Sequence, residues 1–135
     1  MPELRISMES HDASVVVAVQ GELDVVGSQQ FDDCLAEASA VNDRVILDLS
    51  GVDFMDTTAL AVIVGHWRRQ IEAGGAFLLA GARYRYTKAL WITGLADRLP
   101  MYDSLDEALA AARPDPGAAA SGGARESGDP GAAAP

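Results

Sequence analysis

Cysteine and basic residues are both scarce in this chain of 135 residues. Its single cysteine, Cys34, cannot form an internal disulfide or build a thiolate metal cluster. Cys34 lies within QQFDDCLAEA, and we expect it to be a small core residue. Ten basic residues stand against twenty acidic ones, which gives a net charge of −10. This charge argues against nucleic acid as a direct partner, because phosphate binding needs clustered lysine and arginine.

Long apolar runs and a leader pattern are also missing. No stretch of about 18 uncharged apolar residues occurs, so the sequence predicts no membrane-spanning helix. The first residues, MPELRISMES, lack a basic region followed by an apolar one, so no signal peptide is indicated. We therefore expect a cytoplasmic protein without a membrane partner.

The common catalytic motifs do not occur. GxxxxGK[ST], HExxH and GxSxG are absent, and the glycines of VQGELDVVG lack GxGxxG spacing. His11 and His66 lie in separate segments that offer them no catalytic neighbours. We expect a protein that is not an enzyme, with no catalytic residue, no bound metal and no cofactor.

Hydrophobic residues make up 49% of the chain, enough for one modest core and hence one domain. From Pro114 onward the sequence is nearly all proline, glycine, alanine, serine and charge, so we expect a folded domain over 3–113 and a disordered tail over 114–135. Residues 1–60 carry twelve acids and two bases, whereas residues 61–113 carry seven bases and five acids. The acidic half favours either a basic protein partner or simple solubility.

Apolar spacing predicts an α/β fold in which strands and helices alternate. The alternation places the third and fourth strands parallel in one sheet, and an amino-terminal hairpin makes that sheet mixed. GELD at 21–24 is predicted to be a loop, and Trp67 and Trp91 lie on apolar stripes that we expect in the core. The predicted strands are 4–8, 14–20, 44–49, 76–80 and a short one before the last helix; the predicted helices are 28–41, 57–73, one capped by Thr87 and one opened by SLDE at 104–107.

The segment DLSGVDFMDTTAL raises a question of chemistry. Asp48 is predicted to end a strand, and Thr57 and Thr58 follow Asp56 where the next helix begins. Functional loops gather at this end of a parallel strand, and a helix amino terminus favours an anion such as phosphate. Ordinary helix capping by an aspartate or threonine is the competing explanation. A receiver domain that accepts phosphate on Asp48 is a weaker alternative, because no adjacent acid pair follows the first strand.

Three segments resemble one known family. GELD at 21–24, LDLSGVDFMDTTAL at 47–60 and ALWITGL at 89–95 are similar to motifs of STAS-domain anti-sigma factor antagonists. With the order of elements, the resemblance covers about residues 3–112. It implies a single STAS-type domain with a mixed, mostly parallel sheet of four to five strands and about four helices.

The resemblance also implies a partner and a switch. The partner would be an anti-sigma factor with a histidine-kinase-like ATPase fold, whose capture releases a sigma factor, and a protein phosphatase would reverse its phosphorylation of the antagonist. The phosphoacceptor falls on Thr58, with Thr57 as second choice. Threonine stands where serine is commoner, and Ala59 replaces a glycine. The alternative is a constitutive STAS module, not regulated by phosphorylation, that scaffolds a complex or binds a small ligand or nucleotide, with threonines that only cap the helix. The implied partner-binding residues are Gly21, Glu22, Asp24, Phe54, Met55, Asp56 and Ala59.

Overall fold

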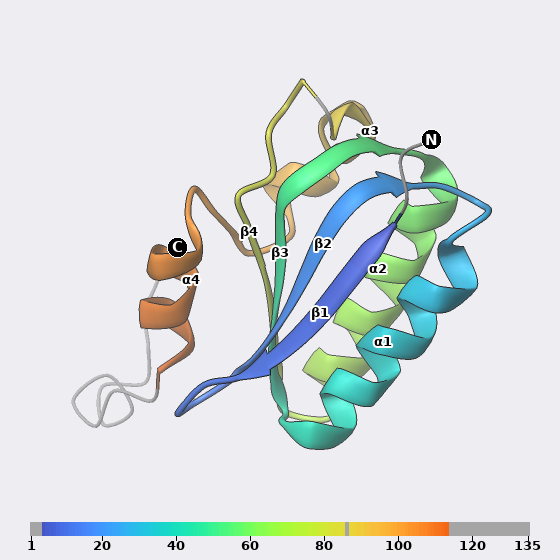
Figure 1. Ribbon diagram of the computed structural model, residues 1–135. Helices are drawn as coiled ribbons and strands as arrows, with labels where there is room; N and C mark the ends of the chain where they lie inside the picture. Colours follow the sequence, from blue (N-terminus) through green and yellow to red (C-terminus); the bar gives the residue numbers. More distant parts are fainter. Residues whose placement is uncertain (1–3, 86, 114–135) are drawn as a thin grey trace.

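A five-stranded sheet with helices on both faces forms the protein (Figure 1). The computed structural model describes residues 4–85 and 87–113. The segment 114–135, predicted from the sequence to be a disordered tail, lies outside these residues. The strands are β1 (Arg5–Ser10), β2 (Val15–Leu23), β3 (Arg44–Met55), β4 (Ala76–Ala80) and β5 (Met101–Tyr102). The helices are α1 (Ser28–Val41), α2 (Thr57–Glu72), α3 (Lys88–Ile92), the 3-10 turn η1 (Leu95–Asp97) and α4 (Leu105–Ala112).

The strands lie in the sheet in the order in which they occur along the chain. β1 and β2 pair antiparallel, and each further neighbouring pair is parallel. The predicted hairpin, the parallel pairing of the third and fourth strands, and the mixed sheet are therefore confirmed.

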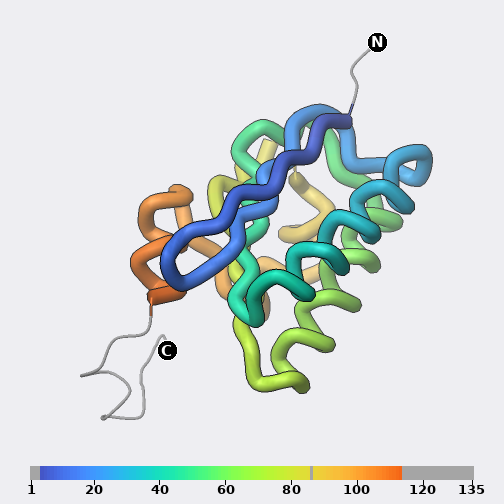
Figure 2. Tube along the Cα trace, turned by 60° about the horizontal axis from the view of Figure 1, so that its bottom comes forward, coloured from blue at the N-terminus to red at the C-terminus, as the bar shows by residue number. Residues whose placement is uncertain are grey.

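Helices α1 and α2 cover one face of the sheet and α4 the other (Figures 1 and 2), and a core layer lies on each face. The larger layer lies under α1 and α2, where alternate strand residues such as Val17, Leu47 and Leu79 are completely buried. The smaller layer lies under α4, which buries Ala108 against Ile46. Because successive strand side chains point to opposite faces, short apolar runs such as RVIL supply both layers.

Two strands extend further than the sequence predicts, and both extensions lead to the start of α2. β3 continues past Asp48 to Met55, so the prediction that Asp48 ends a strand is wrong. GELD is likewise not a loop, since β2 continues to Leu23, which pairs with Met55. Gly21 has a φ of 104°, a left-handed conformation suited to glycine, beside a register shift in this pairing. The two extensions pair with each other, so each supplies backbone hydrogen-bond partners to the other. Because the two segments are far apart in the sequence, the residue pattern of neither one predicts this pairing.

Some predicted core and capping residues have other surroundings. Trp91 is 40% exposed and meets Tyr84 edge-on, at 5.8 Å between ring centroids. Cys34 is only half-buried; burial, with smaller contributions from Glu37 and Asp33, raises the pKa of its thiol. Thr87 donates its hydroxyl to the Arg83 carbonyl and makes no side-chain cap on α3.

The helices of the described residues include none with the length and apolarity needed to cross a membrane.

Candidate functional site

Helix α2 begins at an aspartate cap. The Asp56 carboxylate accepts a hydrogen bond from the Ala59 backbone N–H at 3.1 Å, and its own backbone is extended, as a helix cap requires. Thr57 and Thr58 are the first two residues of the helix itself. Of the two predicted kinds of cap, aspartate is confirmed at Asp56, and the version in which a threonine caps the helix is wrong.

The two threonine hydroxyls remain available for other chemistry. Thr57 is exposed and Thr58 is half-buried. Within residues 4–85 and 87–113, neither hydroxyl has a hydrogen-bond partner. Thr58 lines a groove of about 330 Å³ between α1 and α2, together with Ser28 and Gln29 of α1. A group added to the Thr58 oxygen would lie at the amino terminus of α2, where unpaired N–H groups favour negative charge.

The loop between β2 and α1 lies beside this helix start. The Asp56 backbone N–H donates to the Leu23 carbonyl at 3.0 Å, which joins the end of β2 to the residue that caps α2. The loop that follows Leu23 is therefore held next to the threonines.

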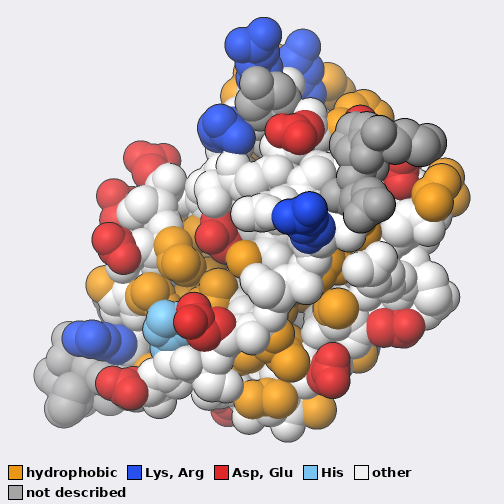
Figure 3. Space-filling model, in the orientation of Figure 1, with side chains coloured by type: hydrophobic (Ala, Val, Ile, Leu, Met, Phe, Trp, Pro, Cys, Tyr) orange, Lys and Arg blue, Asp and Glu red, His pale blue; other side chains and the backbone are white. Residues whose placement is uncertain are grey.

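Asp24 orders this loop and presents two valines to solvent. One carboxylate oxygen of Asp24 accepts from the backbone N–H of Val26 at 3.1 Å and of Gly27 at 3.4 Å. The Ser28 hydroxyl donates to the Val25 carbonyl at 3.0 Å and closes the turn. Val25 is 64% exposed and Val26 is 89% exposed. Hydrophobic side chains are visible on the surface at this loop (Figure 3). We call Val25 and Val26 the valine pair.

The sequence prediction did not include the valine pair. Adjacent valines usually indicate a buried strand, and the exposure of this apolar pair is visible only once the loop is folded. The available signal was their position between Asp24 and Gly27, residue types that are common in turns and unfavourable in strands.

The other predicted partner-binding residues divide into exposed and buried groups. Phe54 is 48% exposed and pairs with Glu22, which is half-buried. Met55 is 5% exposed and Ala59 is completely buried, and both pack in the larger core layer. Only Glu22, Asp24, Phe54 and Asp56 can therefore offer side chains, while Gly21, Met55 and Ala59 shape the backbone beneath them.

The alternative phosphate acceptor Asp48 has a different setting. It lies within β3, is half-buried, and accepts a hydrogen bond from the Ser50 N–H at 3.0 Å. The described part of the chain holds no group of three or more His, Cys, Asp or Glu side chains suited to a metal ion.

His66 links the two helices that border the Thr58 groove. Its Nε2 lies 2.6 Å from an Asp32 carboxylate oxygen, and its side chain is nearly buried. The contact joins α2 to α1 and accounts structurally for a polar residue on the inner side of α2.

Comparison with known proteins bears on this arrangement of strands and helix start. The profile of the STAS domain family matches residues 5–108. The chain belongs to the STAS domain family. The anti-sigma F factor antagonist of Paenibacillus polymyxa is 29% identical over 110 residues, which cover 78% of this chain and 92% of that protein. The anti-sigma-F factor antagonist RsfA of Mycobacterium tuberculosis is 25% identical over 111 residues, covering 80% and 87%.

A solved structure extends the likeness to three dimensions. The crystal structure of an anti-sigma factor antagonist from Mycobacterium paratuberculosis superposes with a TM-score of 0.76 and 26% identity. The superposition covers 83% of this STAS protein and 96% of that chain. The predicted STAS-type fold is therefore confirmed.

Proposed function

We propose that this STAS protein is an anti-sigma factor antagonist. It binds an anti-sigma factor that is a kinase with a histidine-kinase-like ATPase fold, and this capture releases a sigma factor. The protein acts by binding and has no catalytic activity of its own. Support comes from relatives in Paenibacillus polymyxa and Mycobacterium tuberculosis, whose names state this role and whose alignments span most of both chains.

Thr58 is the phosphoacceptor in this proposal, with Thr57 as second choice. The observation that carries the assignment is the Asp56 cap, since the Thr58 hydroxyl then needs no capping role and makes no hydrogen bond within residues 4–85 and 87–113. A phosphate there would lie at the first turn of α2, where the helix dipole stabilises negative charge. The modification is therefore compatible with the fold and acts on the partner contact.

The contact surface consists of the valine pair and Phe54, bordered by Glu22, Asp24 and Asp56. An apolar centre with an acidic border fits a partner pocket that is apolar inside and basic at its edge. Phosphorylation adds about −1.5 to −2 charges and bulk beside that apolar centre. Burying this charge in the contact is unfavourable, so phosphorylation weakens binding, and a protein phosphatase restores it.

A pair of matched variants tests the switch. Isothermal titration measures the binding of the wild type, Thr58→Glu and Thr57→Glu to each ATPase-type anti-sigma factor of the source organism. We expect Thr58→Glu to weaken binding by about thirtyfold or more, because a buried, unpaired charge costs at least about 2 kcal/mol. Thr57→Glu is the control, and it should lose less binding affinity because Thr57 is more exposed than Thr58.

Intact mass after incubation with the captured kinase and ATP locates the phosphate. We expect one added phosphate in the wild type and none in Thr58→Val. Phosphate that persists in Thr58→Val would contradict the assignment, as would Thr58→Glu binding as tightly as wild type. Failure of every ATPase-type anti-sigma factor to bind would overturn the antagonist role itself.

A further inference from the structure

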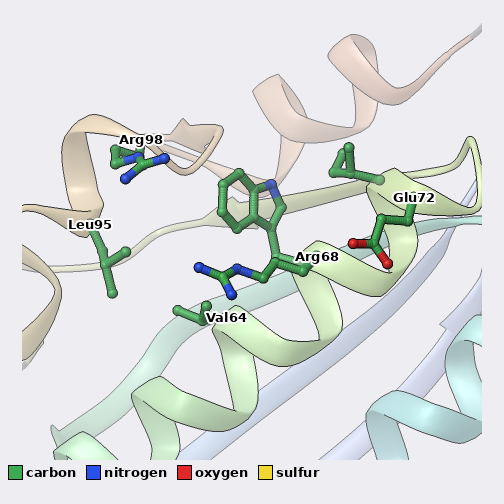
Figure 4. A pocket seen from close by; sticks show the side chains of 7 residues that line it. Val64, Arg68, Glu72, Leu95 and Arg98 are labelled. Atoms are coloured by element: carbon green, nitrogen blue, oxygen red, sulfur yellow. The ribbon is translucent and has the colours of Figure 1, made fainter.

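A second concave site lies at the other end of α2. It is a cavity of about 340 Å³ between the carboxyl-terminal half of α2 and the segment that follows α3 (Figure 4). Arg68 is ten residues beyond Thr58, which along a helix axis is roughly 15 Å. This cavity is therefore separate from the surface proposed to bind the anti-sigma factor. Its lining residues are Val64, Trp67, Arg68, Ile71, Glu72, Leu95 and Arg98.

The walls of this cavity are largely apolar and only partly covered. Val64, Trp67 and Leu95 are half-buried, and Ile71 is 50% exposed. Trp67 and Leu95 pack against the larger core layer from its edge. Apolar walls of this kind, in a cavity at the lower end of the usual ligand-pocket range of about 300 to 1,000 Å³, suit a small organic molecule.

Two guanidinium groups border the cavity from opposite sides. Figure 4 shows Arg98 and Leu95 facing Arg68 and Val64 of α2 across the space. Among the described residues, neither the Arg68 nor the Arg98 side chain has an ion-pair or hydrogen-bond partner. Glu72 also lines the cavity, so the lining keeps one net positive charge. Within a chain of net charge −10, this is a local site for an anion.

We propose that this cavity binds a small organic carboxylate with an apolar body. The body would lie against Trp67, Ile71 and Leu95, and the carboxylate would accept hydrogen bonds from the guanidinium groups of Arg68 and Arg98. Arginine suits this task because its planar fork of donors matches a carboxylate. An uncharged apolar ligand would leave both guanidinium groups without a hydrogen-bond acceptor, so the cavity should prefer a ligand that carries a negative charge.

A fluorescent pair of probes tests the charge requirement. The anion 8-anilino-1-naphthalenesulfonate and its uncharged analogue N-phenyl-1-naphthylamine share the same aromatic body. We expect saturable binding of one sulfonate probe per chain and binding of the uncharged analogue that is about tenfold weaker. Decanoate should displace the sulfonate probe, whereas decanol should not. Equal binding of the two probes, or no saturation up to about 1 mM, would overturn the proposal.

Three arginine variants localise the site. Arg68→Gln and Arg98→Gln should each weaken the sulfonate probe by about tenfold, because each removes a charged hydrogen-bond donor. Arg69→Gln is the matched control, since Arg69 lies on the same helix but lines the Thr58 groove. An equal loss in Arg69→Gln would show that general charge, and no specific cavity, attracts the probe, and the proposal would fail.

The two tryptophans give an internal check by NMR. Trp67 lines the cavity and Trp91 does not, so decanoate should shift the Trp67 indole N–H signal and leave that of Trp91 in place. A shift confined to Trp91 would contradict the site.

Sedimentation without ligand tests whether a second copy of the chain occupies this face. A dimer that Arg98→Gln dissociates would assign the face to that second copy and overturn ligand binding.

Discussion

At its amino end, helix α2 starts from an aspartate cap beside exposed valines and two threonine hydroxyls that have no hydrogen-bond partner among the described residues. Its carboxyl end makes several hydrogen bonds to neighbouring segments. Gln70, which is nearly buried, donates to the Asp43 carbonyl at 2.6 Å. The same carbonyl accepts from the Ala76 N–H at 2.8 Å, and the Gly75 N–H donates to the Gln70 carbonyl at 2.8 Å. The carboxyl end of the helix is thus fixed to the sheet at Asp43. The amino end is joined to β2 through the Asp56 N–H, but the neighbouring valine pair stays exposed and can be bound.

Substitutions at the two ends of α2 should therefore affect different properties of the protein. Substitutions near Gly75 should change the free energy of unfolding, and substitutions near Thr58 should change binding with little loss of stability. Each prediction below tests one side of this division.

The largest effect on stability is expected for Gly75→Ala. An added Cβ would lie 2.1 Å from the Asp43 carbonyl oxygen, a backbone atom that is already held by two hydrogen bonds. We expect a loss of about 3 kcal/mol in the free energy of unfolding, measured by urea denaturation. The control is Gly65→Ala, whose Cβ would meet only Arg69 at 3.8 Å. This variant should gain about 0.5 to 1 kcal/mol, since alanine favours a helix more than glycine does. Equal free energies of unfolding for Gly75→Ala and Gly65→Ala would contradict the proposal that the carboxyl end of α2 anchors the fold.

The next effect concerns binding alone. Val26→Asp places a charge at the centre of the proposed contact, and we expect about thirtyfold weaker binding to the anti-sigma factor. Because Val26 is 89% exposed, the thermal midpoint should stay unchanged. Val41→Asp is the control, since Val41 is exposed at the opposite end of α1. Calorimetric titration of both variants measures the difference, and equal affinity of Val26→Asp and wild type would exclude the valine pair from the contact.

A smaller change is expected from the cap of α2. Asp56→Ala removes the acceptor for the Ala59 N–H and should cost about 1 kcal/mol of stability. Asp53→Ala, at an exposed neighbouring position without a cap, should stay within about 0.5 kcal/mol of wild type. Chemical denaturation of the two variants provides the measurement. A loss as large as that of Gly75→Ala would mean that the amino end also anchors the fold.

The smallest effect concerns the reactivity of Cys34 in α1. Because burial raises the pKa of its thiol, less thiolate is present at a given pH than in the unfolded chain. Disulfide-reagent modification near pH 8 should therefore be slower in the native protein than in urea. The stability linked to this raised pKa is present below about pH 8.5 and declines as the pH rises above it. Native and denatured rates that agree would contradict the shift.

Regular elements were predictable from the sequence because their patterns are local. The helix predicted over 28–41 begins and ends as expected, and the strand predicted over 76–80 matches β4. Ser104 accepts from the Glu107 N–H at 3.2 Å, as the capping box predicts. In each case the information lies within a few residues, as apolar spacing or a capping side chain.

The site was less predictable because its geometry depends on contacts between distant segments. Residues 50–55 are predicted to be a loop, since serine, glycine and aspartate interrupt the apolar pattern. Their strand conformation comes from pairing with residues 20–23 of β2. The cap of α2 could be any of the adjacent polar residues Asp56, Thr57 and Thr58. The position at which the chain enters the helix decides between them. The arginine-lined cavity went unpredicted because Trp67 and Ile71 lie on a stripe that normally becomes core, and here the segment after α3 covers it only partly.

The order of the strands in the sheet has a consequence for synthesis. Each strand pairs with the strand that precedes it along the chain, from β1 to β5. A nascent chain can therefore add each strand to the sheet as it leaves the ribosome, without waiting for a later segment to insert between two earlier ones. β5 is the last strand in this order and has only two residues, so this edge of the sheet offers little backbone for pairing with another chain.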